Sequence, residues 1–211
     1  MPRCTHRVVA LLAILLLAAA ALPFVNFAPN RLVSGEGLWL WQIWAFPPLI
    51  LLFIPALFLL LCWLPGRLPS LWILLLAEAN FALLLWASGE AAQQLAQNSS
   101  PLARTSPGSG LWLGLLLMLL IYSEAIRRLT SRALWRWLLN GQLWLLPCWL
   151  LWSGQLDGLS LMKEYANRQE TFNDALSQHL MLLWGTLLPG LLLGVPLGMW
   201  CWRHPGRQSS V

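Results

Sequence analysis

The stretch LWILLLAEANFALLLWA, residues 71–87, is apolar at all but two positions and decides the class of fold. Crossing the hydrocarbon core of a bilayer takes roughly 20 apolar residues in a helix, because lipid offers no water to satisfy the backbone amides. The stretch is therefore predicted to be a transmembrane helix. Five more apolar stretches bring the predicted number of spans to six, at residues 8–25, 43–64, 111–125, 138–152 and 179–202.

The composition of the chain indicates the same class. Hydrophobic residues make up 58% of the sequence and charged residues only 10%, whereas a soluble domain carries about a quarter charged residues. We therefore predict an all-α, polytopic membrane protein. The net charge of +5 is interpreted as anchoring to anionic membrane lipid. Nucleic acid is not an expected partner, because no solvated segment holds a basic run with interleaved aromatics.

The arginines and lysines predict the orientation of the spans. With the N-terminus in the cytoplasm, nine basic residues fall on the inner side and four on the outer side, so both termini are predicted to be cytoplasmic in a bacterial inner membrane. The first span also has features of a secretory signal peptide, but its apolar run continues through Val25, which favours a retained helix. The inner residues are Arg3, Arg7, Arg67, Arg127, Arg128, Arg132, Arg136, Arg203 and Arg207, and the outer ones are Arg31, Arg104, Lys163 and Arg168.

Two polar residues, Glu78 and Asn80, lie inside the third span. A charge at mid-bilayer is costly, so Glu78 is a candidate functional residue. Two interpretations stay open: a polar contact facing a translocation path or another helix, or a protonated or partnered carboxyl group that fixes helix packing. Near the end of the fourth span, Glu124 precedes Arg127 and Arg128 by three and four residues, a spacing that predicts an ion pair on one helix face.

Small residues recur every four positions in the sixth span, at Gly190, Gly194 and Gly198. Such a stripe lets a second helix backbone approach closely. Pro189 and Pro196 interrupt the backbone hydrogen bonding and are expected to bend the helix. We therefore predict that this span packs tightly against protein.

The segment before that span, residues 159–178, reads LSLMKEYANRQETFNDALSQ. Its apolar residues have helical spacing, which predicts an amphipathic helix on the periplasmic membrane surface. A solvated helical linker is the alternative. Residues 1–158 form the predicted N-terminal multi-helix membrane region.

At residues 171–203 the chain resembles the start of the permease core of osmoprotectant ABC importers. The shared motifs are Gln-His-Leu at 178–180 and Gly-Val-Pro-Leu-Gly at 194–198, followed by Arg203. Three upstream stretches resemble the enterobacterial glycine betaine importer permeases that have an extended N-terminal membrane region. These are PFVNFAPNRLVSGEG at 23–37, LARTSPGSG at 102–110 and SLMKEYANRQETFNDAL at 160–176.

The resemblance implies a membrane-spanning permease component of an importer for glycine betaine or a related osmoprotectant. Its implied partners are an ATP-binding subunit, a periplasmic substrate-binding protein and, at full length, a second permease copy. Residues 179–211 would be the first helix of the core domain. An enzyme is not expected, and no catalytic residue, cofactor-binding residue or metal ligand is assigned.

The sequence departs from the family where the core should continue. Family members have several more helices and a cytoplasmic Glu-Ala-Ala loop that docks on the ATP-binding subunit, and this sequence has no such signature. We therefore expect the N-terminal half of a permease, inserted but unable to transport by itself. A non-transporting membrane scaffold or regulatory subunit is the alternative. A membrane enzyme acting on lipid is disfavoured, because His, Asp and Glu do not cluster at a predicted interface.

Overall fold

The computed structural model describes residues 5–30, 33–97, 99 and 102–203. Arg3, Arg31 and Arg207, used above to predict orientation, lie outside these residues. The chain is mostly helical and divides into two compact units, Met1–Lys163 and Glu164–Val211.

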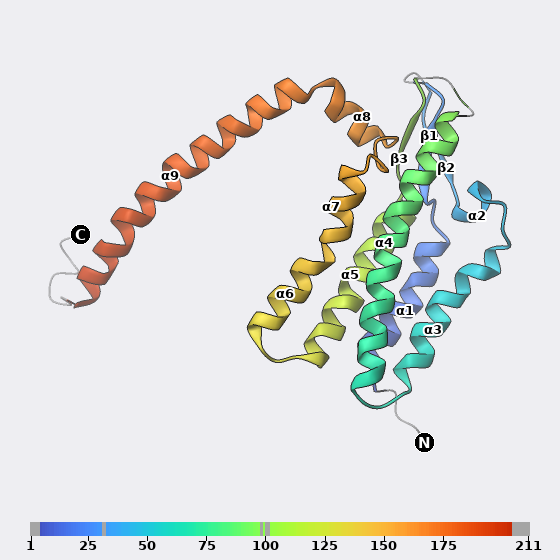
Figure 1. Cartoon of the computed structure of the whole chain (residues 1–211), viewed down its shortest axis with the longest axis horizontal. Coiled ribbons are helices and arrows are strands. Elements are labelled where there is room, and N and C mark those ends of the chain that lie inside the picture. Colours follow the sequence, from blue (N-terminus) through green and yellow to red (C-terminus); the bar gives the residue numbers. More distant parts are fainter. Residues whose placement is uncertain (1–4, 31–32, 98, 100–101, 204–211) are drawn as a thin grey trace. The chain divides into compact units, whose positions relative to one another are not determined.

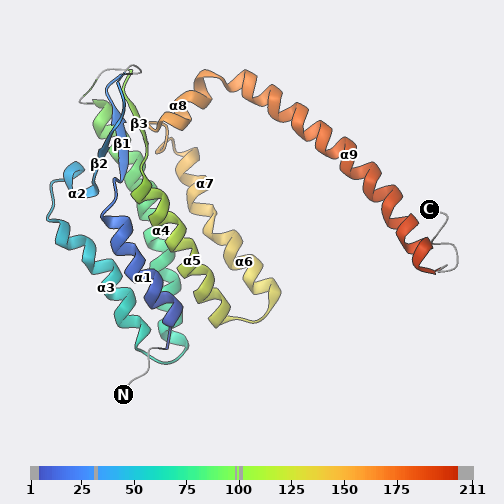
Figure 2. The same ribbon diagram turned by 180° about the vertical axis from the view of Figure 1, so that it is seen from behind.

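The first unit is a bundle of helices that lie side by side and alternate in direction (Figures 1 and 2). Helix α5 packs against α4 and α1, and α1 also packs against α3. A short helix, α2 (Leu40–Ile43), precedes η1. The bundle segments are α1 (Arg7–Ala20), the 3-10 helix η1 (Pro48–Leu52) leading into α3 (Phe53–Cys62), α4 (Arg67–Gln97), α5 (Ser109–Leu129), α6 (Ala133–Leu143) and α7 (Leu145–Trp152).

Apolar residues fill the interior of the bundle and also cover its outside. Val9, Ile73 and Ile121 are fully buried between the helices, whereas Leu11 and Leu116 are more than half exposed. A soluble monomer rarely exposes apolar patches larger than a few hundred Å². Large apolar side chains point outward from every long helix of the bundle, as expected for a membrane protein.

Three helices among the described residues are long and apolar enough to cross a membrane: α4, α5 and α9 (Gln169–Arg203). The sequence predicted six. The predicted span at 8–25 falls on α1, whose 14 residues reach about 21 Å, less than the roughly 30 Å of a hydrocarbon core. The spans predicted at 43–64 and 138–152 are each divided between shorter helices.

Proline explains the break between α6 and α7 and the change from η1 to α3, whereas a turn at residues 44–47, where Ala45 has a φ of 49°, separates α2 from η1. Proline has no N–H to donate to the carbonyl four residues before it, and its ring crowds that carbonyl. Pro147 therefore leaves the Leu143 carbonyl without its helical donor, and α6 ends at Leu143 while α7 begins at Leu145. Pro55 has the same effect on Leu51, which lies in η1 just before α3.

A small antiparallel sheet at one end of the bundle corrects the all-α prediction (Figure 1). Strand β1 (Val25–Ala28) lies between β2 (Glu36–Leu38) and β3 (Arg104–Pro107), and Asn26 is level with Gly37 and with Ser106. These extended segments satisfy one another's backbone groups. Residues 23–25 had been predicted as the end of the first span, and residues 26–38 and 102–110 as parts of outer segments.

Two glycines hold this sheet close to the bundle. The N–H of Gly108 donates to the Phe24 carbonyl at 2.9 Å, and that of Gly110 donates to the Pro23 carbonyl at 2.8 Å. A side chain at either glycine would overlap the backbone of residues 22–24. The start of α5 is therefore fixed against the chain that leaves α1.

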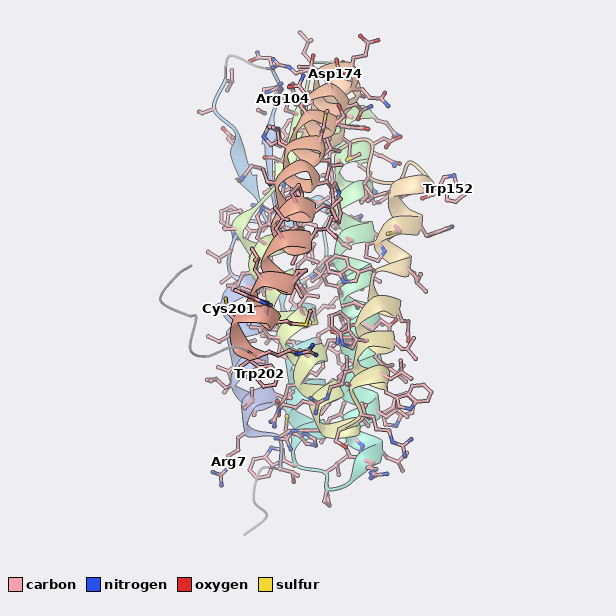
Figure 3. All side chains as sticks on the ribbon, turned by 90° about the vertical axis from the view of Figure 1, so that its left-hand side faces the viewer. Arg7, Arg104, Trp152, Asp174, Cys201 and Trp202 are labelled. Carbon is pink, nitrogen blue, oxygen red and sulfur yellow. The ribbon has the colours of Figure 1, made fainter. Side chains whose placement is uncertain are left out.

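Arginine side chains mark both ends of the first unit. Arg7 lies at the end opposite the sheet, where the α3–α4 and α5–α6 connections also lie, and Arg104 lies at the sheet end (Figures 1 and 3). We refer to the former as the arginine-rich end, because it also holds Arg67, Arg127, Arg128 and Arg132.

The segment predicted to be one amphipathic helix at 159–178 is divided at Arg168. Helix α8 spans Ser160–Asn167, and α9 then runs for 35 residues from Gln169 through Pro189 and Pro196. The rings of Tyr165 and Phe172 meet edge to face across the break, with centroids 5.4 Å apart. The predicted boundary between residues 178 and 179 falls inside α9.

Candidate functional site

The two polar residues of the third predicted span, Glu78 and Asn80, lie on opposite sides of α4. Positions two apart on an α-helix differ by about 200° around its axis. Glu78 accepts a hydrogen bond from Gln142 Nε2 at 2.8 Å, which joins α4 to α6. Asn80 is buried and donates from Nδ2 to the carbonyl of Leu76 in its own helix at 2.7 Å. The structure therefore does not bring the pair together in one polar site.

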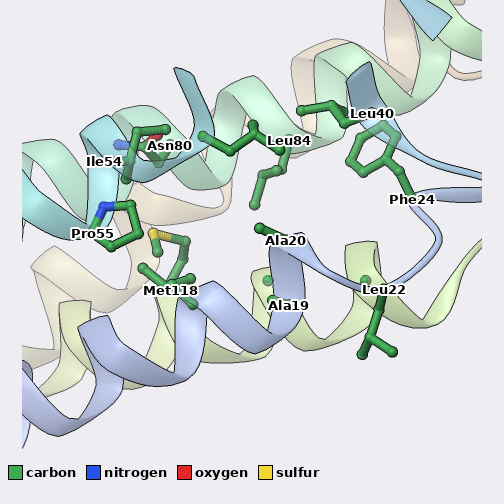
Figure 4. A pocket seen from close by; sticks show the side chains of 14 residues that line it. Ala19, Ala20, Leu22, Phe24, Leu40, Ile54, Pro55, Asn80, Leu84 and Met118 are labelled. Carbon is green, nitrogen blue, oxygen red and sulfur yellow. The ribbon is translucent and has the colours of Figure 1, made fainter. Parts of the chain in front are cut away.

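Asn80 reaches a small cavity between α1, α3, α4 and α5 (Figure 4). The cavity has a volume of about 90 Å³, and among its lining residues Asn80 alone has a polar side chain. Ligand pockets typically measure about 300–1,000 Å³. Phe24 is the single aromatic residue in the wall, whereas a cage for a quaternary ammonium uses several aromatic faces. The geometry is that of an apolar packing cavity.

A charged cluster lies at the arginine-rich end of the bundle. Glu124 is 8% exposed and accepts two hydrogen bonds from Arg127, one from Nε at 2.8 Å and one from Nη2 at 2.9 Å. It accepts a third from Arg128 Nε at 2.7 Å. The ion pair predicted from the spacing is therefore confirmed. Arg128 Nη1 also donates to the Thr5 carbonyl at 3.1 Å, which ties α5 to the residues before α1.

His6 is a buried titratable residue that the sequence analysis did not single out. It is 2% exposed, and neither ring nitrogen meets a hydrogen-bond partner among the described residues. Its backbone N–H and that of Thr5 donate to the Cys62 carbonyl at the end of α3. Burial lowers the pKa of His6, the positive charge of Arg128 lowers it further, and Glu124 opposes both. A lone histidine in a basic N-terminal segment carries no spacing signal that could have revealed this.

Polar contacts at the sheet end fix the connection between α7 and α8. Gln93 Nε2 on α4 donates to the Gln155 carbonyl at 3.1 Å. Ser160 Oγ donates to the Thr105 carbonyl at 2.9 Å, and Lys163 Nζ donates to the Ala103 carbonyl at 3.3 Å. The α7–α8 connection is therefore anchored to α4 and to the β3 segment.

The glycine stripe of α9 lies on an open helix surface. A Cβ atom added at Gly190, Gly194 or Gly198 would meet nothing within 4 Å among the described residues. No residue of α9 is buried in the described part of the chain. Close packing of a second helix on this stripe therefore stays a prediction.

Comparison with known families supplies one finding. The family described as "ABC transporter permease YehY, N-terminal domain" matches residues 5–162, which hold the whole bundle, the sheet and the start of α8. Comparison with curated proteins and with solved structures gives no match.

Proposed function

The chain belongs to the family of the N-terminal domain of the ABC transporter permease YehY, and we propose that it serves an importer for glycine betaine or a related osmoprotectant. Membership of this family makes it a membrane-embedded transport component that associates with an ATP-binding subunit. The osmoprotectant substrate rests on the resemblance of residues 171–203 and of the three upstream stretches. The family match over residues 5–162 carries the permease role, and it supports the substrate only through that role.

Within this role, the bundle is an accessory domain beside the translocation core. Its cavity at Asn80 is small and almost wholly apolar, so it is a poor site for a zwitterionic substrate. We place substrate selection in a periplasmic binding protein and in the permease core, which a homodimer of permease subunits would complete. The same proposal divides the chain into an N-terminal membrane region at 1–158, a periplasmic amphipathic segment at 159–178 and the first helix of the core domain at 179–211.

We also propose that the arginine-rich end of the bundle faces the cytoplasm. Arginine and lysine are enriched on the cytoplasmic side of membrane proteins, and that end holds Arg67, Arg127 and Arg132. The shorter segments α1, η1–α3 and α6–α7 lie beside the long helices α4 and α5 (Figure 1). In this proposal the shorter segments also cross the membrane. Together with α4, α5 and α9 they give six crossings and place both termini in the cytoplasm.

Uptake of labelled glycine betaine tests the substrate. This chain, joined to the rest of a permease core, is expressed with the ATP-binding subunit and the binding protein in a strain that lacks other osmoprotectant importers. We expect uptake that is lost when either this gene or the ATPase activity is removed. Uptake of glycine betaine, choline and carnitine that does not depend on this gene would refute the osmoprotectant role and favour the scaffold alternative.

Cysteine labelling in spheroplasts tests the orientation. Ser131 lies in the α5–α6 turn and Ser34 lies beside the sheet, and both are exposed. In a background with the native cysteines replaced, a membrane-impermeant maleimide should label Ser34→Cys at once. Ser131→Cys should react only after permeabilisation. Labelling of Ser131→Cys in intact spheroplasts would reverse the proposed orientation.

A further inference from the structure

A second cavity opens at the arginine-rich end, and the family role does not explain it. It has a volume of about 490 Å³ and lies between the start of α4, the end of α5 and the α5–α6 turn. Four guanidinium groups and several hydroxyl and apolar groups surround it. Its lining residues are Arg67, Arg127, Arg128, Leu129, Thr130, Ser131, Arg132 and Trp135.

The charges of this cavity are unbalanced. Glu124 is the one carboxylate among the described residues that pairs with these arginines, and Arg127 and Arg128 already occupy it. No described carboxylate pairs with Arg67 or Arg132. Guanidinium groups bind phosphate oxygens through paired, charge-assisted hydrogen bonds. The cavity therefore suits an anion that brings its own negative charge.

The backbone around the cavity is fixed in advance and adds to its positive potential. The Thr130 carbonyl accepts a bond from Arg136 Nε at 3.0 Å, and Thr130 Oγ1 accepts one from the Arg132 N–H at 3.2 Å. Helices α4 and α6 both begin here, and the N-cap of α6, Arg132, provides no capping side chain. Helix N-termini carry partial positive charge and uncapped N–H groups. An anion would thus enter a site that needs little reorganisation.

Apolar side chains next to the cavity indicate which kind of molecule carries the anionic group. Leu68 is 71% exposed, Leu134 68% and Trp135 52%. Leu68 directly follows Arg67, and Leu134 and Trp135 lie two and three residues after Arg132, so charged and apolar groups lie close together at the edge of the apolar bundle. A free phosphate ion would gain nothing from these side chains, whereas the acyl chains of a lipid would pack on them.

We propose that this cavity binds the phosphodiester headgroup of an anionic phospholipid, with Arg67 and Arg132 as its main ligands and the acyl chains lying on Leu68, Leu134 and Trp135. Basic pockets at the ends of membrane helices are suited to such headgroups. The lipid would join α4 to the α5–α6 turn from outside the bundle.

Native mass spectrometry of the detergent-purified chain tests this site. Cardiolipin, phosphatidylglycerol and phosphatidylcholine are titrated into delipidated protein. We expect the two anionic lipids to bind at least about tenfold more tightly than phosphatidylcholine, and the preference to weaken as salt is raised. The double variant Arg67→Gln/Arg132→Gln should lose about tenfold or more of that affinity.

Arg7→Gln is the matched control, because Arg7 is exposed at the same end but does not line the cavity. It should change the affinity for anionic lipid by less than about twofold. Equal loss in Arg7→Gln and in the double variant would show general surface attraction and overturn the site. Displacement of the lipid by inorganic phosphate or glycerol phosphate at equal concentration would overturn the assignment to a lipid.

Discussion

The carboxylate of Glu124 organises the charged cluster at the arginine-rich end of the bundle. It holds Arg127 and Arg128, and Arg128 in turn holds the Thr5 carbonyl before α1. Arg128 is 28% exposed and Arg127 63% exposed, so water screens the Arg127 pair more strongly than the Arg128 pair. Most of the stabilisation therefore comes from the bond between Glu124 and Arg128.

Replacement of Glu124 by glutamine should destabilise the bundle. The variant keeps the size of the side chain but leaves Arg128 without its counter-charge, which we expect to cost about 1–3 kcal/mol after allowance for exposure. Thermal unfolding in detergent, followed by tryptophan fluorescence, measures the effect. Glu36→Gln is the control, because Glu36 is exposed on β2. An equal loss of stability in the two variants would contradict the prediction.

The pKa of His6 gives the stability of the bundle a dependence on pH. Burial and Arg128 lower the pKa of this residue below its ordinary 6.5, against the opposing effect of Glu124. Below pH 6.5 the unfolded chain therefore binds more protons at this position than the folded chain does. The contribution of neutral His6 to the unfolding free energy is constant above about pH 6.5. It is lost as the pH falls from there through the lowered pKa that His6 has in the folded state.

Unfolding midpoints between pH 5 and pH 8 test this prediction in detergent solution. The wild-type midpoint should fall below about pH 6.5, and His6→Leu should flatten that part of the profile. His6→Leu should also be tolerated at neutral pH, because it removes two ring nitrogens that lack described partners. A His6→Leu profile that overlays the wild type over the whole range would be the contrary result.

These two residues also show what the sequence can reveal at this scale. The Glu124 cluster could be predicted because its members are three and four positions apart on one helix. The burial of His6 could not, because it depends on α3 and α5, which approach from residues 62 and 128. Glu78 and Asn80 lie two positions apart in the predicted span, yet they face different neighbours.

Among the secondary-structure elements, the junction of α1 with α5 leaves little room for change. Gly110→Ala would bring Cβ against the carbonyl oxygens of Ala19, Leu22 and Pro23. Backbone atoms must move to relieve such an overlap, so we expect a loss of about 1–3 kcal/mol in unfolding free energy. Gly141→Ala is the control, because its Cβ in α6 would meet nothing within 4 Å.

The control should change stability in the opposite direction. An alanine inside a helix is favoured over glycine by about 0.5–1 kcal/mol, so Gly141→Ala should be neutral or stabilising. Unfolding midpoints of the two purified variants, measured side by side, decide the matter. A Gly110→Ala variant as stable as Gly141→Ala would show that the α1–α5 junction can relax.

Element lengths explain which parts of the fold could be predicted from the sequence. The long helices α4 and α5 were found because apolar composition over about 15 or more residues is a strong signal. Strands β1 and β2 have only four and three residues, and the pairing of β1 with β3 joins segments about 80 positions apart, which no local pattern reveals. The break at Pro147 was visible in principle, but hydropathy alone merged α6 and α7 into one span.

In the molecule as a whole, many large apolar side chains of the described residues are exposed instead of packing in the chain's own core. In the second unit no described residue of α9 is buried, although Leu182, Leu192 and Leu193 are all large and apolar. Lipid can cover leucine, but a smooth glycine surface contributes little contact to lipid and much to a closely packed helix. The stripe therefore suggests that α9 completes its packing against other permease helices.

Gly194→Leu tests that packing in the assembled transporter. Gly185→Leu is the matched control, because residue 185 lies about 180° around the helix from residue 194 and also has open space at its Cβ position. Both variants should insert into the membrane like the wild type. Only Gly194→Leu should reduce co-purification with the ATP-binding subunit and glycine betaine uptake, by about tenfold or more, because its side chain holds the two helices apart. Equal assembly and uptake in the two variants would mean that the stripe faces lipid, and the interface of α9 would then have to lie on its leucine-rich side.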